Sequence, residues 1–407
     1  MSDSRDRLKT IRRICERNDF LTADPYDIWK TPLGFRVKNF YNHHRVLGIP
    51  GAAFLTLFDT YLNDRVRAFY NRQEYPIVRA LAAQALIQIY GATGDDSVFP
   101  AARRHLEWLQ RNACEGYSGP CWGLGFPYAV SRNFHYGVNT PLTTMTPYAL
   151  EAFVRYSKAT GDTRYLSIIE GVFQFFENDV QVMEETEEFL ATSYSASQDR
   201  TVINAVSYTM YSYALLLPYI DVSDAARIER RIHKLYRYIV MSQREDGSWP
   251  YSPEPPVFVD CFHSCIVIKN LIKTSRIIDL GDCAAVVASA YEYLKRATFV
   301  ANAGLFKRFA VANKPGVVRF DLYDNSEMLN LACLMGDADL VISLERAMAD
   351  VFVSGDTIYS HVDRLGLRHG RDFLRWAVMP YVYSLSTVEA MWAELTRSAS
   401  VSVADGS

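Results

Sequence analysis

The sequence lacks several patterns that would assign it to a class of protein at once. No uninterrupted run of 18 apolar residues occurs, so we expect no membrane span. No block of basic residues stands out, and 43 Lys and Arg against 46 Asp and Glu leave a net charge of −3. We therefore expect no nucleic-acid partner.

Motifs for metals, nucleotides and secretion are missing as well. The seven cysteines are scattered without a CxxC pair or a zinc spacing, and no HExxH, P-loop or Rossmann glycine pattern occurs. We therefore expect no metal site and no cofactor. An odd cysteine count without a disulfide framework fits a reducing cytosol. The charged N-terminal stretch lacks the apolar core of a signal peptide, so we expect a cytoplasmic protein.

Aromatic residues, in contrast, are plentiful. They make up 13% of the 407 residues and include 26 Tyr and 22 Phe, while hydrophobic residues reach 49%. This is the composition of a globular protein, and its rings can fill a large core or line a ligand groove. Length alone suggests two or three domains, but a closed single-domain architecture can also reach this size.

An internal repeat organises most of the chain. The segment YGATGDDSVFPAARRHLEWL from Tyr90 resembles YSKATGDTRYLSIIEGVFQF from Tyr156, and each reads as helix, Gly-Asp turn, helix. Fainter copies follow, and successive turns are 67, 62, 58 and 55 residues apart. Two helices and a loop per step predict an array of α-hairpins. The turns centre on Gly94, Gly161, Ser223, Gly281 and Gly336.

The two helices of each repeat differ in character. The helix before the turn is apolar and aromatic, and the helix after it is charged with one apolar stripe. Six inner and five outer helices follow from this pattern, and the amphipathic stretch 54–70 is expected to be the sixth outer helix. The sequence therefore predicts an all-α (α/α)6 toroid, a six-hairpin barrel, with an open solenoid as the alternative. We expect a single domain over 51–398, an N-terminal extension over 1–50 that packs on it, and a disordered tail over 399–407.

The links between helices also fall into two kinds. Links from inner to outer helices are short, whereas those from outer to inner helices are long, at about 112–145, 178–202, 244–261, 298–325 and 354–372. In a toroid all the long links gather on one face, around the mouth of the axis. Long ordered loops on a rigid scaffold are where functional sites usually lie.

The long link SQREDGSWPYSPEPPVFVDCFHSC over 242–265 carries the leading acid/base candidates. Asp260 suits the N-cap of the fourth inner helix, and His263 falls in its first turn, where the helix dipole favours a neutral imidazole. We predict that Asp260 and His263 transfer protons, with Tyr251 or Asp321 as the complementary group. The alternative is structural: a helix cap for Asp260 and a lone packed histidine for His263.

The same loops offer groups that can bind a ligand. Sugar rings stack on aromatic faces through their C–H groups, and isoprenoid carbocations also use such rings; packing of the loops on themselves is the alternative. A basic cluster near the last inner helix suits a carboxylate or phosphate. The predicted substrate-binding residues are Trp122, Tyr128, Tyr194, Asn204, Trp249, Tyr323, Arg375 and Trp376.

Two resemblances to known families follow from these segments. QREDGSW at 243–249 is similar to the QxxxGxW repeat of squalene and oxidosqualene cyclases, which are α/α toroids. It occurs once, and the DxDD acid motif of those cyclases is absent, so this likeness supports the fold more than the activity.

The second resemblance covers nearly the whole chain. DPYDIWKTPL, WGLGFPYAVSR, SYSASQDRTVINA, SQREDGSWPYS, VDCFHS and LRWAVMPYVYSLS resemble the bacterial toroid proteins of exopolysaccharide and capsule gene clusters. This resemblance implies a glycan setting rather than a particular reaction. Where those proteins tend to read IDxHSxAQ, this chain reads FDLYDNSEML. Asp321 is kept, but the second histidine is replaced, which puts the family's acid or base in doubt.

Three functional hypotheses remain open at this point. The first is a carbohydrate-active enzyme of bacterial surface-polysaccharide metabolism, a hydrolase, lyase or epimerase acting on an oligosaccharide or activated sugar. The second is a terpenoid-cyclase or prenyl-type toroid enzyme with a deep aromatic cavity. The third is a non-catalytic glycan-binding or assembly subunit.

Overall fold

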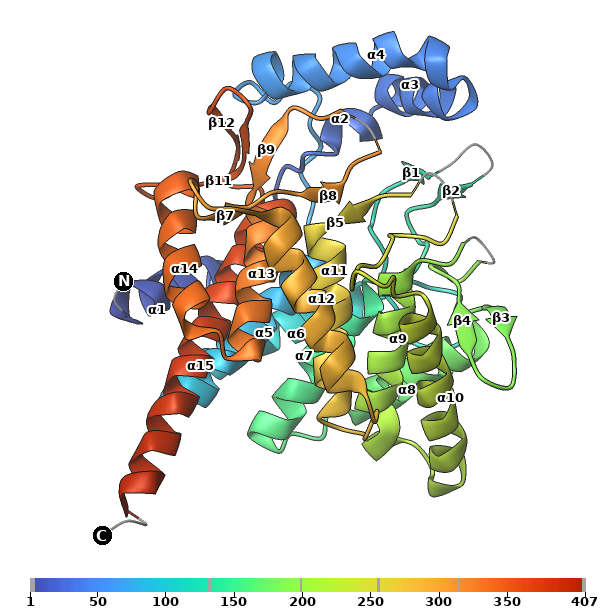
Figure 1. Cartoon of the computed structure of the whole chain (residues 1–407), viewed down its shortest axis with the longest axis vertical. Helices are drawn as coiled ribbons and strands as arrows, with labels where there is room; N and C mark the ends of the chain where they lie inside the picture. Colours follow the sequence, from blue (N-terminus) through green and yellow to red (C-terminus); the bar gives the residue numbers. More distant parts are fainter. Residues whose placement is uncertain (1–3, 131–133, 198–199, 255–256, 314, 405–407) are drawn as a thin grey trace.

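The fold is a closed ring of helical hairpins, an all-α (α/α)6 toroid (Figure 1). The computed structural model describes residues 4–404, apart from 131–133, 198–199, 255–256 and 314. Each inner helix packs against the next, and the last packs against the first, which closes the ring. The inner helices are α5 (Pro76–Thr93), α7 (Thr146–Thr160), α9 (Ile203–Leu216), α11 (Cys261–Ser275), α13 (Leu322–Met335) and α15 (Met379–Ala404).

Six outer helices each cover one inner helix. Glycine ends several inner helices, as at Gly94 and Gly161, where φ of 73° and 71° gives the left-handed turn into the outer helix. The inner helices are buried over most of their length, in α9 at every residue, whereas the outer helices bury a single stripe. The outer helices are α6 (Phe99–Arg111), α8 (Leu166–Asn178), α10 (Val222–Met241), α12 (Cys283–Thr298), α14 (Ala338–Phe352) and α1 (Ser4–Cys15).

The identity of the sixth outer helix corrects the prediction from sequence. The segment 54–70 does not cover the ring; α1 does, packed against α15 and α5. Its buried Arg7 forms ion pairs with Glu345 of α14 and Glu389 of α15, and Ile11 is fully buried. The N-terminal extension thus supplies an element of the ring. Segment 54–70 instead belongs to a hairpin above the ring, where much of its apolar surface stays exposed.

That hairpin and the strands occupy the end of the ring where the long loops gather (Figure 1). The hairpin consists of α3 (Pro32–His43) and α4 (Arg45–Leu57) and continues into the π-helix η1 (Phe58–Asn63). The remaining short helices are α2 (Asp27–Lys30), η2 (Asp96–Val98), η3 (Leu217–Tyr219) and η4 (Leu374–Val378).

The strands are short and pair antiparallel within the loops. The register between β9 and β11 sets Asp321 opposite His361, and the register between β5 and β8 sets Asp260 opposite Phe309. The pairs are β1 (Tyr128–Ala129) with β2 (His135–Tyr136), β3 (Val182–Glu185) with β4 (Leu190–Thr192), β5 (Val259–Asp260) with β8 (Phe309–Val311), β6 (Phe299–Val300) with β7 (Leu305–Phe306), and β11 (Thr357–Asp363) with β9 (Val318–Asp321), β10 (Val353–Ser354) and β12 (Arg368–Arg371).

The last inner helix, α15, ends at Ala404. Among the described residues, none of the helices combines the length and the apolar character needed to cross a membrane.

Candidate active site

A cavity of about 330 Å³ opens among the long loops at the mouth of the ring. Aromatic side chains dominate its wall. Besides tyrosine hydroxyls, the titratable groups of its described lining are His263, Arg200 and Arg375, and no carboxylate of the described residues lines it. The cavity therefore combines flat apolar faces with positive charge. Its lining tyrosines include Tyr26, Tyr128, Tyr194, Tyr208, Tyr251 and Tyr323.

Two residues at the start of α11, Asp260 and His263, form a hydrogen-bonded pair at the edge of this cavity. The Asp260 carboxylate caps the helix by accepting from the backbone N–H of His263, and its Oδ2 lies 2.7 Å from Nδ1 of the same histidine. An ionised carboxylate only accepts hydrogen bonds, so Nδ1 carries a proton toward Asp260. The pairing of β5 with β8 fixes the Asp260 backbone. The result is an oriented histidine, with a side chain 18% exposed, at the cavity wall.

Aromatic rings surround this histidine. The Phe262 ring centroid lies 3.8 Å from that of His263, and the Tyr251 ring lies 4.5 Å away on another side. Tyr251 in turn stacks on Phe258 at 4.7 Å. Burial raises the pKa of Tyr251, so its phenol stays protonated at neutral pH and can donate a hydrogen bond.

Further tyrosines come from the inner helices. The Tyr208 hydroxyl of α9 donates a hydrogen bond to the Tyr148 hydroxyl of α7 at 2.6 Å. Tyr323 of α13 stacks on Trp376 with ring centroids 5.1 Å apart. Burial raises the pKa of all three phenols. These phenols therefore stay protonated at neutral pH and give the cavity neutral polar groups.

Buried ion pairs join the inner helices farther along the ring axis. Lys273 Nζ of α11 lies 3.0 Å from both carboxylate oxygens of Glu151 in α7, and Lys269 pairs with Glu327 of α13. Since the inner helices begin at the loop face, these residues lie deeper than His263. The ion pairs tie facing helices together beneath the cavity.

Asp321 lies behind the cavity wall rather than on it. Its Oδ2 accepts from the indole N–H of Trp376 at 3.1 Å and from Arg308 at 2.7 Å. Arg308 also reaches Asp324 at 3.0 Å, and burial raises the pKa of that carboxyl to about 7 despite the guanidinium. Asp321 thus orients Trp376, which does face the cavity, and this position does not suit the direct proton transfer predicted for it.

Arg375 faces the cavity but is already paired. Its guanidinium donates to Asp24 Oδ1 at 2.8 Å, and both side chains are buried. The guanidinium also lies 5.2 Å from the Tyr26 ring centroid. Arg375 therefore anchors the N-terminal segment at the cavity, and it contributes positive charge that Asp24 partly neutralises.

The two predicted loop tryptophans lie in the core and not on the cavity. The Trp122 indole N–H donates to the carbonyl of Leu109, at the end of α6, at 2.9 Å, and its ring is fully buried. The Trp249 indole does the same to Ile239 of α10, also at 2.9 Å. Each tryptophan fastens a long loop to the preceding outer helix. Trp122 therefore does not line the axial cavity, and Trp249 borders a small void beside Asp260.

The QREDGSW segment has a structural explanation along the same lines. Gln243 Nε2 donates to the carbonyls of Gly247 and, at 3.2 Å, Val286 of the next outer helix. Gly247 has φ 91°, and a Cβ there would meet the Ser289 carbonyl oxygen at 2.6 Å. With Trp249 bonded to Ile239, the segment joins α10 to α12. Its likeness to the cyclase repeat therefore concerns the scaffold.

The cavity brings together most of the residues predicted from sequence. Asp260 contacts it through His263. Tyr26, Tyr148 and Tyr208 also line the cavity and were not predicted from sequence; Tyr148 and Tyr208 lie on inner helices and not on loops. The predicted residues that line the cavity are Tyr128, Tyr194, Asn204, Tyr251, His263, Tyr323, Arg375 and Trp376.

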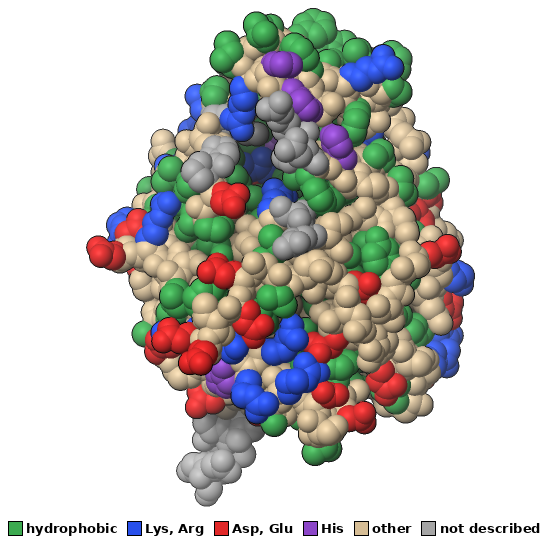
Figure 2. Space-filling view, turned by 90° about the vertical axis from the view of Figure 1, so that its right-hand side faces the viewer, with side chains coloured by type: hydrophobic (Ala, Val, Ile, Leu, Met, Phe, Trp, Pro, Cys, Tyr) green, Lys and Arg blue, Asp and Glu red, His purple; other side chains and the backbone are tan. Residues whose placement is uncertain are grey.

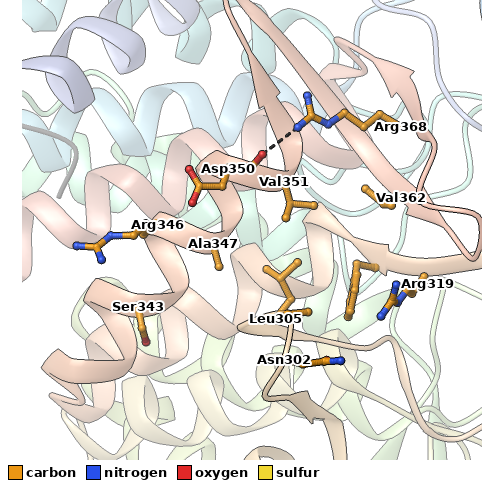
Figure 3. A pocket seen from close by; sticks show the side chains of 13 residues that line it. Asn302, Leu305, Arg319, Ser343, Arg346, Ala347, Asp350, Val351, Val362 and Arg368 are labelled. Atoms are coloured by element: carbon orange, nitrogen blue, oxygen red, sulfur yellow. Dashed lines mark hydrogen bonds between the residues drawn. The ribbon is translucent and has the colours of Figure 1, made fainter.

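A larger hollow of about 580 Å³ lies outside the ring, beside α14 and the strands β9, β11 and β12 (Figure 3). Its polar wall includes Arg319, Arg346 and Arg368, and Arg368 donates to the Asp350 carbonyl at 2.9 Å. No histidine lines it among the described residues. We therefore place the candidate active site in the smaller axial cavity, which holds the oriented His263.

Several solved structures of similar fold are described as sugar-processing enzymes. A sugar epimerase from a ruminal bacterium matches with a TM-score of 0.58 at 13% identity, over 78% of this chain and 87% of its own. The GH76 α-mannanase from Bacteroides thetaiotaomicron matches at 0.58 and 10% identity, over 92% and 100%. D-mannose isomerase matches at 0.59 and 11% identity, over 78% and 87%. At these identities the comparisons show the fold alone.

No protein-family model and no curated protein matches the chain. The resemblance to toroid proteins of polysaccharide gene clusters therefore stays a prediction.

Proposed function

We propose that the protein is a carbohydrate-active enzyme that transfers a proton at a carbon atom of an acidic sugar, as an epimerase or an eliminating lyase. The observation that carries this proposal is His263, which lines the axial cavity and whose Nδ1 is held by the Asp260 carboxylate. A neutral histidine oriented in this way is a general base. Tyr251, protonated and in ring contact with it, is the proposed acid.

The charge of the cavity supports the acidic sugar. Arg200 lines it, with its guanidinium 4.6 Å from the Tyr194 ring centroid and 5.7 Å from that of Tyr251. A cation near a sugar carboxylate stabilises the enolate-like charge that develops when the neighbouring carbon loses its proton. The absence of carboxylates from the described lining also favours an anion there.

Hydrolysis fits the cavity less well. Most glycoside hydrolases use a pair of carboxylates on either side of the scissile bond. The two carboxylates that could form such a pair here are Asp260 and Asp321, but the first is engaged by His263 and the second lies behind Trp376. A terpenoid cyclase would in turn need an acid at the cavity, and the described lining offers only phenols, a histidine and guanidinium groups among its charged or titratable groups.

Product masses distinguish these reactions. The purified protein is incubated with panels of acidic oligosaccharides, neutral oligosaccharides and prenyl diphosphates. We expect turnover only of acidic sugars, to a product of unchanged mass or to unsaturated fragments whose masses sum to that of the substrate. A product that gains one water, or turnover of the prenyl panel alone, would overturn the proposal. Binding of a sugar without any product would support the non-catalytic alternative.

A further inference from the structure

The hairpin above the ring exposes an unusual amount of apolar surface. In α4, of sequence RVLGIPGAAFLTL, the described side chains of Val46, Leu47 and Phe54 are 78%, 72% and 67% exposed. Leu33 and Leu62 on the neighbouring elements are also exposed. Figure 2 shows this region as hydrophobic side chains at the end of the molecule where Figure 1 places α3 and α4, with basic and histidine side chains among them. An exposed patch of this kind marks an interaction surface.

The contacts that hold the hairpin in place lie between α3 and α4 and between α3 and the ring, and they leave the outer face of α4 exposed. Gly48 lets α4 approach α3 closely, since a Cβ there would meet Tyr41 Cα at 2.4 Å. Helix α3 is fastened to the loops of the ring in turn: Asn39 Oδ1 lies 3.1 Å from His135 Nε2, and Lys38 Nζ lies 3.3 Å from the Tyr128 ring centroid. The apolar face of α4 is therefore held outward by contacts that do not cover it.

The charge on the hairpin has one sign. The sequence has no acidic residue between Asp27 and Asp59, whereas this stretch carries four Lys and Arg residues and two neighbouring histidines. Arg36 and Arg45 are exposed, and neither forms an ion pair with an acidic side chain of the described residues. A symmetric contact between two copies of this chain would bring these cations toward their own equivalents, which disfavours self-association through this face.

We propose that the α3–α4 hairpin docks on the surface of an anionic lipid bilayer. Val46, Leu47 and Phe54 enter the boundary between headgroups and acyl chains, and Arg36 and Arg45 contact the lipid phosphates. The 13 residues of α4 are too few to span a bilayer, which takes about 20, so the helix lies in the interface. Because α3 rests on Tyr128, docking brings the mouth of the axial cavity close to the lipid surface.

Sedimentation with vesicles tests this docking without reference to any activity. The full chain is mixed with vesicles of phosphatidylcholine alone, or of phosphatidylcholine with phosphatidylglycerol, and the pelleted fraction is measured at low and high salt. We expect pelleting with the anionic vesicles that weakens with salt. The double variant Leu47→Asp/Phe54→Asp should bind at least about tenfold more weakly. Arg45→Gln should bind about fivefold more weakly.

A matched control and a second readout keep the result unambiguous. Val222, 91% exposed at the start of α10, offers an equivalent apolar-to-acidic change, and Val222→Asp should pellet like the unchanged chain. Circular dichroism checks that each variant is folded. Absence of pelleting overturns the proposal, as does pelleting that Leu47→Asp/Phe54→Asp leaves unchanged. Light scattering shows whether the chain forms dimers. If the unchanged chain is a dimer, the double variant is not, and no vesicles are bound, the face belongs to a contact with a second copy instead.

Discussion

The Asp260 carboxylate lies 2.7 Å from Nδ1 of His263, one helical turn along α11, and both residues owe their places to the start of that helix. Asp260 is the N-cap, and the same carboxylate accepts from the backbone N–H and the ring of His263. The fold of the helix end thus fixes the ring. The proposed base is therefore set by backbone structure, which suits a proton transfer that needs a fixed geometry.

Asp260→Asn should lower the rate of the proposed reaction by about 10²-fold or more, because a neutral amide no longer holds the proton on Nδ1. The substrate affinity should change little. Steady-state kinetics on the substrate found in the sugar panel measure both quantities. Asp337, the N-cap of the outer helix α14, provides the matched control. A rate for Asp260→Asn equal to that of Asp337→Asn would show that Asp260 only caps its helix.

Tyr251→Phe should lower the rate by about 10²-fold or more while the protein stays as stable as before. The ring still stacks on Phe258, so only the proton donor is removed. Rate and thermal unfolding are measured on the same preparation. Full activity in this variant would remove Tyr251 from the mechanism and leave Tyr323 or Tyr208 as the acid.

Arg375→Gln should destabilise the protein by about 3–5 kcal/mol, since it leaves the buried Asp24 carboxylate without its cation. The double variant Asp24→Asn/Arg375→Gln should recover part of this loss. Urea unfolding of the single and double variants gives the coupling energy. An unchanged stability together with a lost affinity for acidic sugars would instead assign Arg375 mainly to the ligand.

Glu151 should make stability depend on pH in the acid range. Burial alone would raise the pKa of this carboxyl, but Lys273 and Arg155 outweigh burial and lower it from 4.5 to about 2. The lowered pKa stabilises the fold fully above pH 4.5, and this contribution, about 3 kcal/mol, is lost as pH falls toward 2.

The matched variant for this effect is Glu151→Gln, which cannot titrate. The free energy of unfolding is measured with guanidinium at pH 6 and at pH 3. We expect the difference between the unchanged chain and the variant to be smaller at pH 3. A gap that is the same at both values would contradict the assignment of the shift to this ion pair.

Much of the fold could be predicted from sequence because the repeat leaves a local signal at every turn, such as Gly94 and Gly161. The closing helix could not. Segment 54–70 has the amphipathic pattern of an outer helix, yet its apolar residues face outward, whereas α1 buries a narrow stripe that its charges conceal. Which of two amphipathic stretches completes a ring depends on long-range packing, such as the ion pairs of Arg7 with Glu345 and Glu389.

The site was predictable to the extent that it follows from local structure. Asp260 and His263 are three residues apart at a helix start, and that spacing alone brings them together. Trp122 was predicted to bind a ligand because it lies in a long loop. A loop tryptophan that bonds to an outer helix has the same sequence pattern as one that stacks on a sugar. Tyr148 and Tyr208 could not be predicted from the long loops, because both lie within inner helices. Tyrosines within apolar inner helices were the available signal.

The central claim is that His263 removes a proton from carbon, and hydrogen exchange from solvent tests it most directly. The protein is incubated in deuterated water with the acidic sugar that it turns over, and the product is examined by NMR and mass spectrometry. His263→Ala is compared with His233→Ala, an exposed histidine of the outer helix α10. The account predicts that the product carries deuterium at one carbon or, if it is unsaturated, has lost the hydrogen of that carbon. It also predicts that this change is absent with His263→Ala and present with His233→Ala. A product formed with all its C–H bonds intact, or full exchange in His263→Ala, would contradict the claim.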